Sequence, residues 1–394
     1  MRPPDALESE PLRSILAREF ERARGDTEKL ARVRPQLDAA RARGENVNAL
    51  YPNDVYLSVA PGMGRFLYHA ALADSARTIV EFGTSYGIST LHLAAAAART
   101  GGRVIGTELE AEKAARAAAT LKEAGLARVS EIRQGDALQT LANVSAPIDL
   151  LFLDGWKDLY LPVLEMLLPR LRPGALVLAD NIHTFPEELR PYRGRMSRAG
   201  GPFFTTIVPF ESGLAMSRYA PEGSDAAAWQ WPHRGTGTLI GIARKSRRRA
   251  PMEELESVAV SAEGGLDGDN RGRFTERAVT VLDSERWQAA VAELDGAGAL
   301  DWTLRRANLL TRGTELPHGP GGVIMVGDTV LEVTGETRPC SRMEEQQPGL
   351  LKALSPDWRG GVTCRVLQPG TLSKGDPVRT LISPPAPARP ALPG

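Results

Sequence analysis

The chain is poor in cysteine, in long apolar runs and in net charge. Only two of its 394 residues are cysteines, Cys340 and Cys364, so a disulfide framework is excluded and a reducing, cytoplasmic setting is expected. No apolar stretch is long enough to span a bilayer, and the first ten residues lack the apolar core of a signal peptide. The formal net charge is zero, so no overall field draws the chain to nucleic acid or to a membrane. We therefore expect an ordinary globular protein with neither as its partner.

The rest of the composition divides the chain into five parts. Residues 1–54 are charged and helix-prone, and predict a helical cap on the domain that follows. Residues 55–220 alternate apolar strands with helices, whereas 235–383 consists of short strands between glycine turns. Between these two domains, 221–234 is rich in Gly, Pro, Ser and Ala and predicts a linker. The proline-rich end, 384–394, predicts a disordered tail.

The first domain has the pattern of a parallel sheet covered by helices. We expect strands at 78–82, 103–109, 129–136, 148–155, 175–182, 203–210 and 214–220, and helices at 56–73, 88–99, 110–124, 138–142 and 160–171. This alternation predicts the α/β class, a doubly wound Rossmann-like sheet whose last two strands pair antiparallel at one edge. Ligands of such sheets bind beyond the carboxyl ends of the strands. Five acids fall at those ends: Glu81, Glu108, Asp136, Asp154 and Asp180.

The stretch Thr78–Glu108 is typical of a nucleoside site. Gly83 and Gly87 form a glycine turn after the first strand, and Glu108 ends the second strand. Glycines let the backbone approach a ligand, and an acid at that place can bind both ribose hydroxyls. The spacing GxxxG differs from the GxGxxG of dinucleotide binders, so a pyrophosphate is not the expected ligand. The alternative for Glu108 is an acid that only ends a strand.

A second group of polar residues lies in 151–182. Asp154 and Lys157 follow one expected strand, and Asp180 and Asn181 follow the next. Two carboxylates and an amide oxygen at adjacent strand ends form a hard oxygen site, which suits Mg²⁺ or a similar divalent cation. A cation there would lower the pKa of Lys157 and let it act as a general base. The alternative is a solvated surface lysine.

Together these motifs resemble the class I S-adenosylmethionine-dependent methyltransferases, in particular the metal-dependent catechol O-methyltransferase-like group. EFGTSYGIS resembles that family's first cofactor motif, and DGWKDLY with ADN resembles its metal and base motif. The resemblance implies S-adenosylmethionine as cofactor and a small-molecule hydroxyl compound as methyl acceptor. It implies cofactor binding by Glu81, Gly83, Ser85, Gly87, Ser89, Glu108, Asp136 and Asp154, a divalent cation on Asp154, Asp180 and Asn181, and proton removal by Lys157.

The catechol enzymes carry one more acid near the edge strands, which holds a second substrate hydroxyl. Between Phe204 and Gly213 only Glu211 is present. The resemblance therefore implies methyl transfer without identifying catechol as the acceptor.

The second domain has the pattern of an all-β barrel. From Thr238 on, short strands follow one another between glycine turns, and only 284–294 and 346–354 look helical. The basic run Arg244–Arg249 is interpreted as a solvated loop rather than a nucleic-acid patch, because no aromatic residues lie among its charges. Cys340 lies between Arg338 and Arg342, which favour its thiolate. A thiolate at a barrel rim can carry sulfur or act as a nucleophile, and the alternative is a small core residue.

Five segments of this domain resemble the MOSC domain of molybdenum cofactor sulfurases and related proteins. They are GGLDGD (264–269), RAVTVLD (277–283), RRANLLTRG (305–313), RPC (338–340) and CRVLQPGTLSKGDPV (364–378). The resemblance implies that Cys340 carries persulfide sulfur or binds the molybdenum of a pterin cofactor. Arg305, Arg306 and Asn308 lie in a matching segment and are expected to bind an anionic pterin phosphate. Cys364 is expected to be a packing residue.

We therefore expect a bifunctional protein, an S-adenosylmethionine-dependent O-methyltransferase followed by a MOSC domain that handles sulfur or molybdenum cofactor. The alternative is a scaffold that binds S-adenosylmethionine without catalysis. Activity would then lie in the MOSC domain, as a sulfur carrier or as a molybdenum-dependent reductase of N-hydroxylated compounds. A molybdoenzyme or a sulfur donor protein is the expected partner, and a homodimer is expected only by analogy with similar methyltransferases.

Overall fold

The computed structural model describes residues 5–224, 236–272, 275–294 and 298–384 of the chain. Two units are distinguished, one of residues 1–207 and 212–229, the other of 208–211 and 230–394. The position of one unit relative to the other is not determined, so each is described by itself. Most of the predicted linker, 221–234, and nearly all of the predicted tail, 384–394, lie outside the described residues.

The first unit is built on a seven-stranded sheet with the order β3-β2-β1-β4-β5-β7-β6. Its strands are β1 (Thr78–Phe82), β2 (Arg103–Glu108), β3 (Ser130–Gln134), β4 (Ile148–Leu153), β5 (Leu171–Ala179), β6 (Phe203–Val208) and β7 (Leu214–Tyr219). Strands β1 to β5 pair in parallel, and β7 pairs antiparallel with β5. The predicted doubly wound sheet is confirmed, with β6 and β7 as neighbours at one edge.

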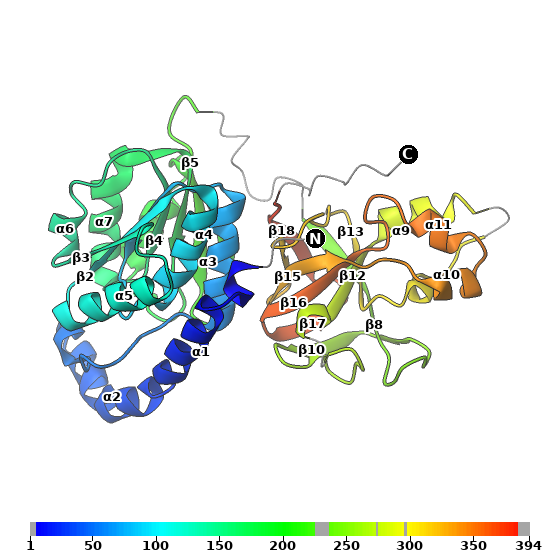
Figure 1. The fold of residues 1–394 in the computed structure, drawn as a ribbon, viewed down its shortest axis with the longest axis horizontal. Helices are drawn as coiled ribbons and strands as arrows, with labels where there is room; N and C mark the ends of the chain where they lie inside the picture. The colour runs from blue at the N-terminus through cyan, green and yellow to red at the C-terminus, as the bar shows by residue number, and fades with distance from the viewer. Residues whose placement is uncertain (1–4, 225–235, 273–274, 295–297, 385–394) are drawn as a thin grey trace. The chain divides into compact units, whose positions relative to one another are not determined.

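Helices cover both faces of this sheet (Figure 1). On one side lie α3 (Pro61–Ala73), α4 (Ile88–Thr100) and α5 (Ala111–Glu123). On the other lie α6 (Ala137–Thr140) and α7 (Tyr160–Leu167), and α8 (Arg190–Met196) packs into the same apolar cluster as α7. Ala94–Ala97 of α4 are buried, and these small side chains let the helix lie close to the sheet. The glycine turn before α4 is thereby held at the carboxyl ends of the strands.

Two long helices precede this sheet, as the sequence predicted for residues 1–54. After η1 (Ala6–Glu8) come α1 (Leu12–Ala23) and α2 (Asp26–Ala42), and then η2 (Asn48–Leu50). Leu12, Ile15 and Leu16 form the buried face of α1. A charged residue is buried with them, because Glu19 has no exposed surface.

Three predicted helices are wrong at an end that lies next to a proline. The helix expected over 56–73 begins at Pro61, and residues 56–60 are not helical. The helix expected over 160–171 ends at Leu167, a 3₁₀ turn with Pro169 follows, and β5 begins at Leu171. The helix expected over 346–354 is interrupted, because Pro348 and the left-handed Gly349 (φ 84°) separate α10 (Ser341–Gln346) from α11 (Leu350–Leu354). A residue before proline is biased away from the helical region, and proline lacks the N–H that a helix interior requires.

The second unit is a closed barrel (Figure 1). The sheet runs β13-β12-β16-β15-β14-β18-β8-β9, and β13 also pairs with β8, so that seven strands close and β9 continues outside them. These strands are β8 (Gly237–Arg244), β9 (Glu253–Leu255), β12 (Val279–Asp283), β13 (Leu309–Arg312), β14 (Val323–Val326), β15 (Thr329–Glu336), β16 (Val362–Gln368) and β18 (Pro377–Ile382). The predicted all-β barrel is confirmed.

Smaller elements complete the second unit. A separate three-stranded sheet consists of β11 (Gly265–Leu266), β10 (Ser257–Ser261) and β17 (Gly370–Ser373). The helix α9 (Ser284–Val291) packs with α10 and α11 in an apolar cluster of its own. Among the described helices of the whole chain, none combines the length and hydropathy of a membrane span.

Candidate functional site

The glycine turn after β1 lies against the loop after β4. Gly83 has φ 95°, and a Cβ added to it would lie 2.5 Å from the amide nitrogen of Gly155. Any side chain at position 83 would therefore push the two loops apart. Gly87 also has a positive φ, 90°, and is the N-cap of α4. Gly83 is thus required by the close approach of the loop after β4, and the predicted contact of both glycines with a cofactor stays a prediction.

Glu81 is the most deeply buried acid of this turn. Its side chain has no exposed surface, and burial raises its pKa to about 7. Hydroxyl groups partly compensate, because Thr84 and Thr90 donate to its Oε2 and Ser89 also hydrogen-bonds to the carboxyl group. The other oxygen, Oε1, is buried with no partner in the described part of the chain. Ser89 thus contacts Glu81, and its predicted cofactor contact stays a prediction.

Glu108 ends β2 and is fixed by backbone N–H groups. Its Oε2 accepts from the amide of Ser85 (2.7 Å), and its Oε1 accepts from the amide of Glu110 (2.9 Å). Ser85 has a left-handed backbone (φ 47°), and its hydroxyl donates to the carbonyl of Tyr56 (2.6 Å). The predicted ribose acid and the glycine turn are therefore linked directly.

Asp136 lies at the end of β3 and is exposed. It is the N-cap of α6, where its side chain accepts from the amide of Leu138 (2.9 Å). Capping alone explains an aspartate at this position. The predicted contact of Asp136 with adenine stays a prediction.

Asp154, Lys157 and Asp180, which we call the acid–lysine group, lie at the ends of β4 and β5. The Nζ atom of Lys157 lies 3.5 Å from Oδ1 of Asp154, and donates to the carbonyl of Gly155 and to the hydroxyl of Tyr160, each at 2.9 Å. Burial lowers the pKa of Lys157 and raises the pKa of Asp154. Only 14% of the lysine side chain is exposed, so it is not a solvated surface lysine.

Asp180 is the second buried acid of the group. Burial raises its pKa, and its Oδ1 accepts from the hydroxyl of Ser212 and from the amide of Asn181. Asn181 has a left-handed backbone (φ 65°), so the chain leaves the strand at this point. The carboxyl groups of Asp154 (side chain 11% exposed) and the buried Asp180 both interact electrostatically with Lys157, and an additional cation would stabilise them. The donor set of Asp154, Asp180 and Asn181 therefore fits a hard divalent cation.

Aromatic rings surround the amine of Lys157. Its Nζ lies 4.9 Å from the ring centre of Tyr160 and 5.7 Å from that of Phe185. Trp156 packs against Tyr51, with their ring centres 5.3 Å apart. A pocket is lined by residues 56–59, 83–86, 88 and 89, together with Asp154 itself. Asp154 thus lines the pocket at the glycine turn and also lies beside Lys157.

The two cysteines of the second unit differ in exposure. Cys340 is exposed and lies at the N-cap of α10. Cys364 has no exposed surface, lies in the core of the barrel, and burial raises the pKa of its thiol. Cys364 is a packing residue, as predicted. Arg338 is 86% exposed and pairs with Glu336, whereas Arg271, Arg305 and Arg306 all interact electrostatically with Cys340.

Four cations of the second unit form what we call the basic cluster: Lys245, Arg271, Arg305 and Arg306. Lys245 is 4% exposed, burial lowers its pKa to about 8, and its Nζ is buried with no partner among the described residues. Burial also lowers the pKa of the other three. Arg305 donates to the carbonyls of Gly360 and Thr337, and so also fixes the segment that leads to Cys340.

Asn308 lies beside this cluster, but its side chain hydrogen-bonds to other residues of the barrel. Its Oδ1 accepts from the amide and hydroxyl of Thr280, and its Nδ2 donates to Ala243 and Asp269. It has no exposed surface. Its predicted contact with a phosphate stays a prediction, and the structure gives it a clear structural role.

Sequence reasoning missed Lys245 and Arg271. The run Arg244–Arg249 was predicted to be a solvated loop, which holds for residues 246–249 but is wrong for Lys245, because that residue directly follows β8 and faces inward. Every second residue of β8 from Gly237 to Ala243 is buried, and Lys245 continues this set past the end of the strand, which is the signal that could have found it.

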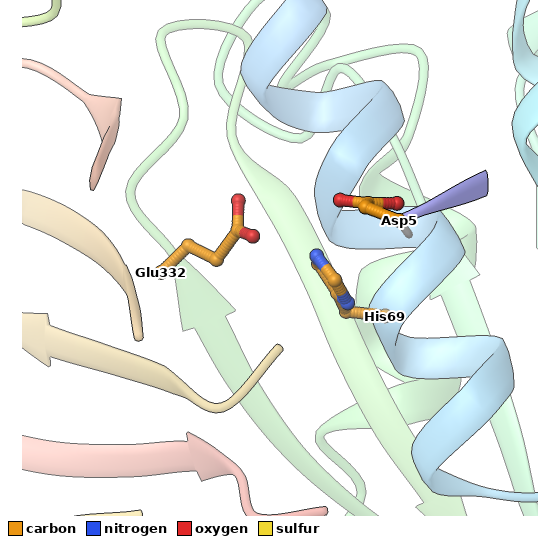
Figure 2. A group of neighbouring side chains, drawn as sticks. All are labelled: Asp5, His69 and Glu332. Carbon is orange, nitrogen blue, oxygen red and sulfur yellow. The ribbon is translucent and has the colours of Figure 1, made fainter. Parts of the chain in front are cut away.

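One more pair of polar side chains lies in the first unit. The ligand atoms of Asp5 and His69, which is on α3, lie within 4.8 Å of each other (Figure 2). Glu332, also labelled in Figure 2, is on β15 of the other unit, so only Asp5 and His69 can be considered together. Two ligands are fewer than a protein metal site uses, and the pair carries no metal assignment.

Comparisons with known proteins match the two units to two different families. A model of a methyltransferase domain matches residues 80–182, and a model of the MOSC domain matches residues 261–379. A catechol O-methyltransferase of Niastella koreensis is 35% identical over 130 residues, which are 32% of this chain and 58% of that protein. A protein of Mycobacterium tuberculosis described as a probable O-methyltransferase is 31% identical over 168 residues, 40% of this chain and 70% of its own length.

Solved structures give a similar match for the first unit. The O-methyltransferase of Bacillus cereus, solved in complex with SAH, is 25% identical with a TM-score of 0.39, over 49% of this chain and 90% of that one. The chain spans 58% and 57% of the lengths of the two catechol O-methyltransferases that it matches.

Proposed function

We propose that the first unit transfers a methyl group from S-adenosylmethionine to a hydroxyl group of a small molecule. The chain belongs to the O-methyltransferases through this unit, and it carries a MOSC domain in its second unit. The observation that carries this proposal is the acid–lysine group, buried next to the glycine turn.

Lys157 is the proposed base. Burial lowers its pKa, which favours the neutral amine that can accept a proton. The hydroxyl of Tyr160 and the carbonyl of Gly155 hold Nζ in place. The acceptor hydroxyl would give its proton to Nζ, and its oxygen would then attack the methyl group in line with the departing sulfur.

The glycine turn and the ends of β1 and β2 are the proposed cofactor site. S-adenosylmethionine would supply an electrophilic methyl group on a positively charged sulfur. Glu108 keeps lone pairs free on both oxygens beside the bonds from Ser85 and Glu110, and these can accept from ribose hydroxyls. Gly83, Gly87 and Ser89 would lie along the rest of the cofactor, with Glu81 beneath it, Asp154 at its methionine end and Asp136 near the adenine.

Asp154, Asp180 and Asn181 would hold a divalent cation such as Mg²⁺. When bound, it would polarise the acceptor oxygen and make its proton easier to remove. The aromatic rings of Phe185, Trp156 and Tyr51 favour a planar acceptor such as a phenol, since flat apolar surfaces suit one another.

We propose that the second unit handles an anionic group, either sulfur on Cys340 or the pterin phosphate of molybdenum cofactor. The unpartnered Nζ of Lys245 supports an anion at this place, because a buried ammonium without a partner is costly. Lys245, Arg271, Arg305 and Arg306 would hold the molybdenum cofactor by its phosphate, and the metal would supply redox chemistry. A molybdoenzyme or a sulfur donor protein is the corresponding partner. Both cysteines are unpaired, which supports a cytoplasmic setting, and a homodimer remains a proposal by analogy.

Calorimetry with S-adenosylmethionine tests the first part. We expect binding by the full chain and a loss of at least tenfold in affinity for Glu108→Ala, because two ribose hydrogen bonds to a charged group are removed. Equal binding by the variant would contradict the assignment. A pooled set of phenols and catechols then tests catalysis, with methylated product expected and abolished by a chelator.

A scaffold that binds the nucleoside without catalysis is the alternative from another class. It predicts cofactor binding with no methylated product from any acceptor. For the second unit, metal analysis of purified protein separates the two candidates. Stoichiometric molybdenum that is lost in Cys340→Ser supports cofactor binding, and its absence from both proteins supports a sulfur carrier.

A further inference from the structure

The segment 56–59 forms one wall of the pocket at the glycine turn. Within it, Leu57 has a left-handed backbone (φ 48°), although the residue is 40% exposed. A leucine in the left-handed region costs about 1–3 kcal/mol and persists only where neighbouring groups hold it. Something outside the segment must therefore fix this wall.

Asp26, the first residue of α2, makes the contacts that fix it. Its Oδ2 accepts from the amides of both Tyr56 and Leu57, each at 2.8 Å. The peptide unit that leads into the left-handed Leu57 is therefore held by a single carboxylate oxygen. Asp26 is 9% exposed, and its Oδ1 is buried without a partner in the part of the chain that is described.

The side chain of Tyr56 is held from α1 and α5. Its hydroxyl donates to Oε2 of the fully buried Glu19 (2.8 Å) and accepts from Arg116 (2.6 Å). The guanidinium of Arg116 also lies over the rings of Tyr56 and Tyr86. The N-terminal helices thus bind this segment twice: α2 through its backbone amides, and α1 through the side chain of Tyr56.

The wall is in turn bonded to the proposed ribose acid. The carbonyl of Tyr56 accepts from the hydroxyl of Ser85, and the amide of Ser85 donates to Glu108. A continuous set of hydrogen bonds therefore runs from Asp26 through Tyr56 and Ser85 to Glu108.

We propose that Asp26 is a positioning residue of the cofactor site, which holds the wall 56–59 in the conformation that receives the cofactor. This inference rests on the proposed function, in which the pocket takes S-adenosylmethionine. Asp26 acts through the backbone of Tyr56 and Leu57 and makes no contact with the cofactor itself. The N-terminal helices are then part of the cofactor site.

Binding of S-adenosylhomocysteine to the full chain tests this, measured by calorimetry for the wild type, Asp26→Ala and Asp26→Asn. The alanine variant loses two hydrogen bonds to a charged acceptor, and we expect binding about tenfold to a hundredfold weaker. The asparagine variant can accept both N–H groups on its carbonyl oxygen, and its amide nitrogen takes the place of the unpartnered Oδ1, so we expect affinity within about threefold of wild type.

Asp38→Ala is the matched control, because Asp38 lies on the same helix with its side chain 62% exposed. We expect it to bind as the wild type does. Wild-type affinity in Asp26→Ala, or an equal loss in Asp26→Asn and Asp26→Ala, would overturn the inference. Absence of binding by the wild type would overturn the proposed function and this inference with it.

Amide hydrogen exchange distinguishes a local effect on the segment 56–59 from destabilisation of the whole first unit. In Asp26→Ala we expect faster exchange of the Tyr56 and Leu57 amides, with the amides of β4 unchanged. If the β4 amides also lose protection, the double variant Asp26→Ala/Leu57→Gly decides, because glycine adopts the left-handed region without cost. Recovery of β4 protection in the double variant supports the role of Asp26 in holding a strained wall, and no recovery overturns it.

Discussion

The two units bury charges of opposite sign at their candidate sites. In the first, burial raises the pKa of Glu81, Asp154 and Asp180, and Lys157 lies beside Asp154. In the second, burial lowers the pKa of Lys245 and of three neighbouring arginines. Burial takes these groups out of water, and a ligand of opposite charge would compensate for the hydration that they lose. The first site is thus suited to a positively charged ligand, and the second to an anion.

The folds produce these charges in different ways. In the parallel sheet the acids come from successive strand ends, which the crossover topology brings to one edge. In the barrel the cations come from the end of one strand, from a loop and from a 3₁₀ turn far apart in sequence. The place of the acids follows from the topology of a parallel sheet, whereas the place of the cations depends on how the strands of the barrel close.

The largest expected effect comes from Lys157→Met. Removing the proposed base should lower the rate of methyl transfer by about 10²- to 10⁴-fold, because general base catalysis contributes on that order. Affinity for S-adenosylhomocysteine should stay within about threefold, since Lys157 lies on the acceptor side. Steady-state kinetics with a phenol acceptor and calorimetry give the two numbers. Lys122→Met, at an exposed position of α5, is the control, and equal rates in both variants would contradict the assignment.

The second prediction concerns pH and the buried acid of the first unit. The pKa of Glu81 is raised from 4.5 to about 7 in the folded chain, so the folded state binds its proton more tightly than the unfolded state does. Stability from this group is therefore present below pH 4.5 and lost as pH rises to 7, by about 3 kcal/mol in total. Glu81→Gln should remove that loss. The free energy of unfolding in urea, monitored by hydrogen exchange of the β1 amides, is measured for the wild type and for Glu81→Gln at pH 5 and pH 8. If the two proteins differ in this free energy by the same amount at both pH values, the prediction is contradicted.

The third prediction is the counterpart in the second unit. The pKa of Lys245 is lowered from 10.5 to about 8, so its destabilising effect is present below pH 8 and disappears as pH rises to 10.5. Lys245→Met should therefore stabilise the barrel at neutral pH, while weakening its affinity for inorganic phosphate about tenfold to a hundredfold. Thermal unfolding and phosphate titration measure the two effects. Arg248→Met, at an exposed position, is the control. A ligand-binding role would be contradicted if Lys245→Met raised both the thermal stability and the phosphate affinity, or lowered both.

The same contrast explains what the sequence could and could not predict. The positions of Glu108, Asp154 and Asp180 at or just after strand ends could be predicted, because a strand end is visible as soon as the alternation of strands and helices is recognised. Lys245 was not found, because a buried lysine inside a basic run looks like its solvated neighbours until the strand before it is placed. The contacts of Asp26 could not be predicted either, since they join α2 to a segment 30 residues away through backbone amides. Strand ends follow a rule of topology, whereas such contacts depend on tertiary packing.

The smallest expected effect separates the two cysteines within the second unit. Cys364 is fully buried in the barrel core, so Cys364→Ser would place a hydroxyl where apolar side chains surround it and should destabilise the unit by about 1–3 kcal/mol. Cys340 is exposed, and Cys340→Ser should change the unfolding free energy by less than about 0.5 kcal/mol. Urea unfolding of the two variants gives both values. A large loss in Cys340→Ser would mean that this thiol supports the fold, and the anion-binding interpretation of the second unit would then rest on Lys245 and its arginine neighbours alone.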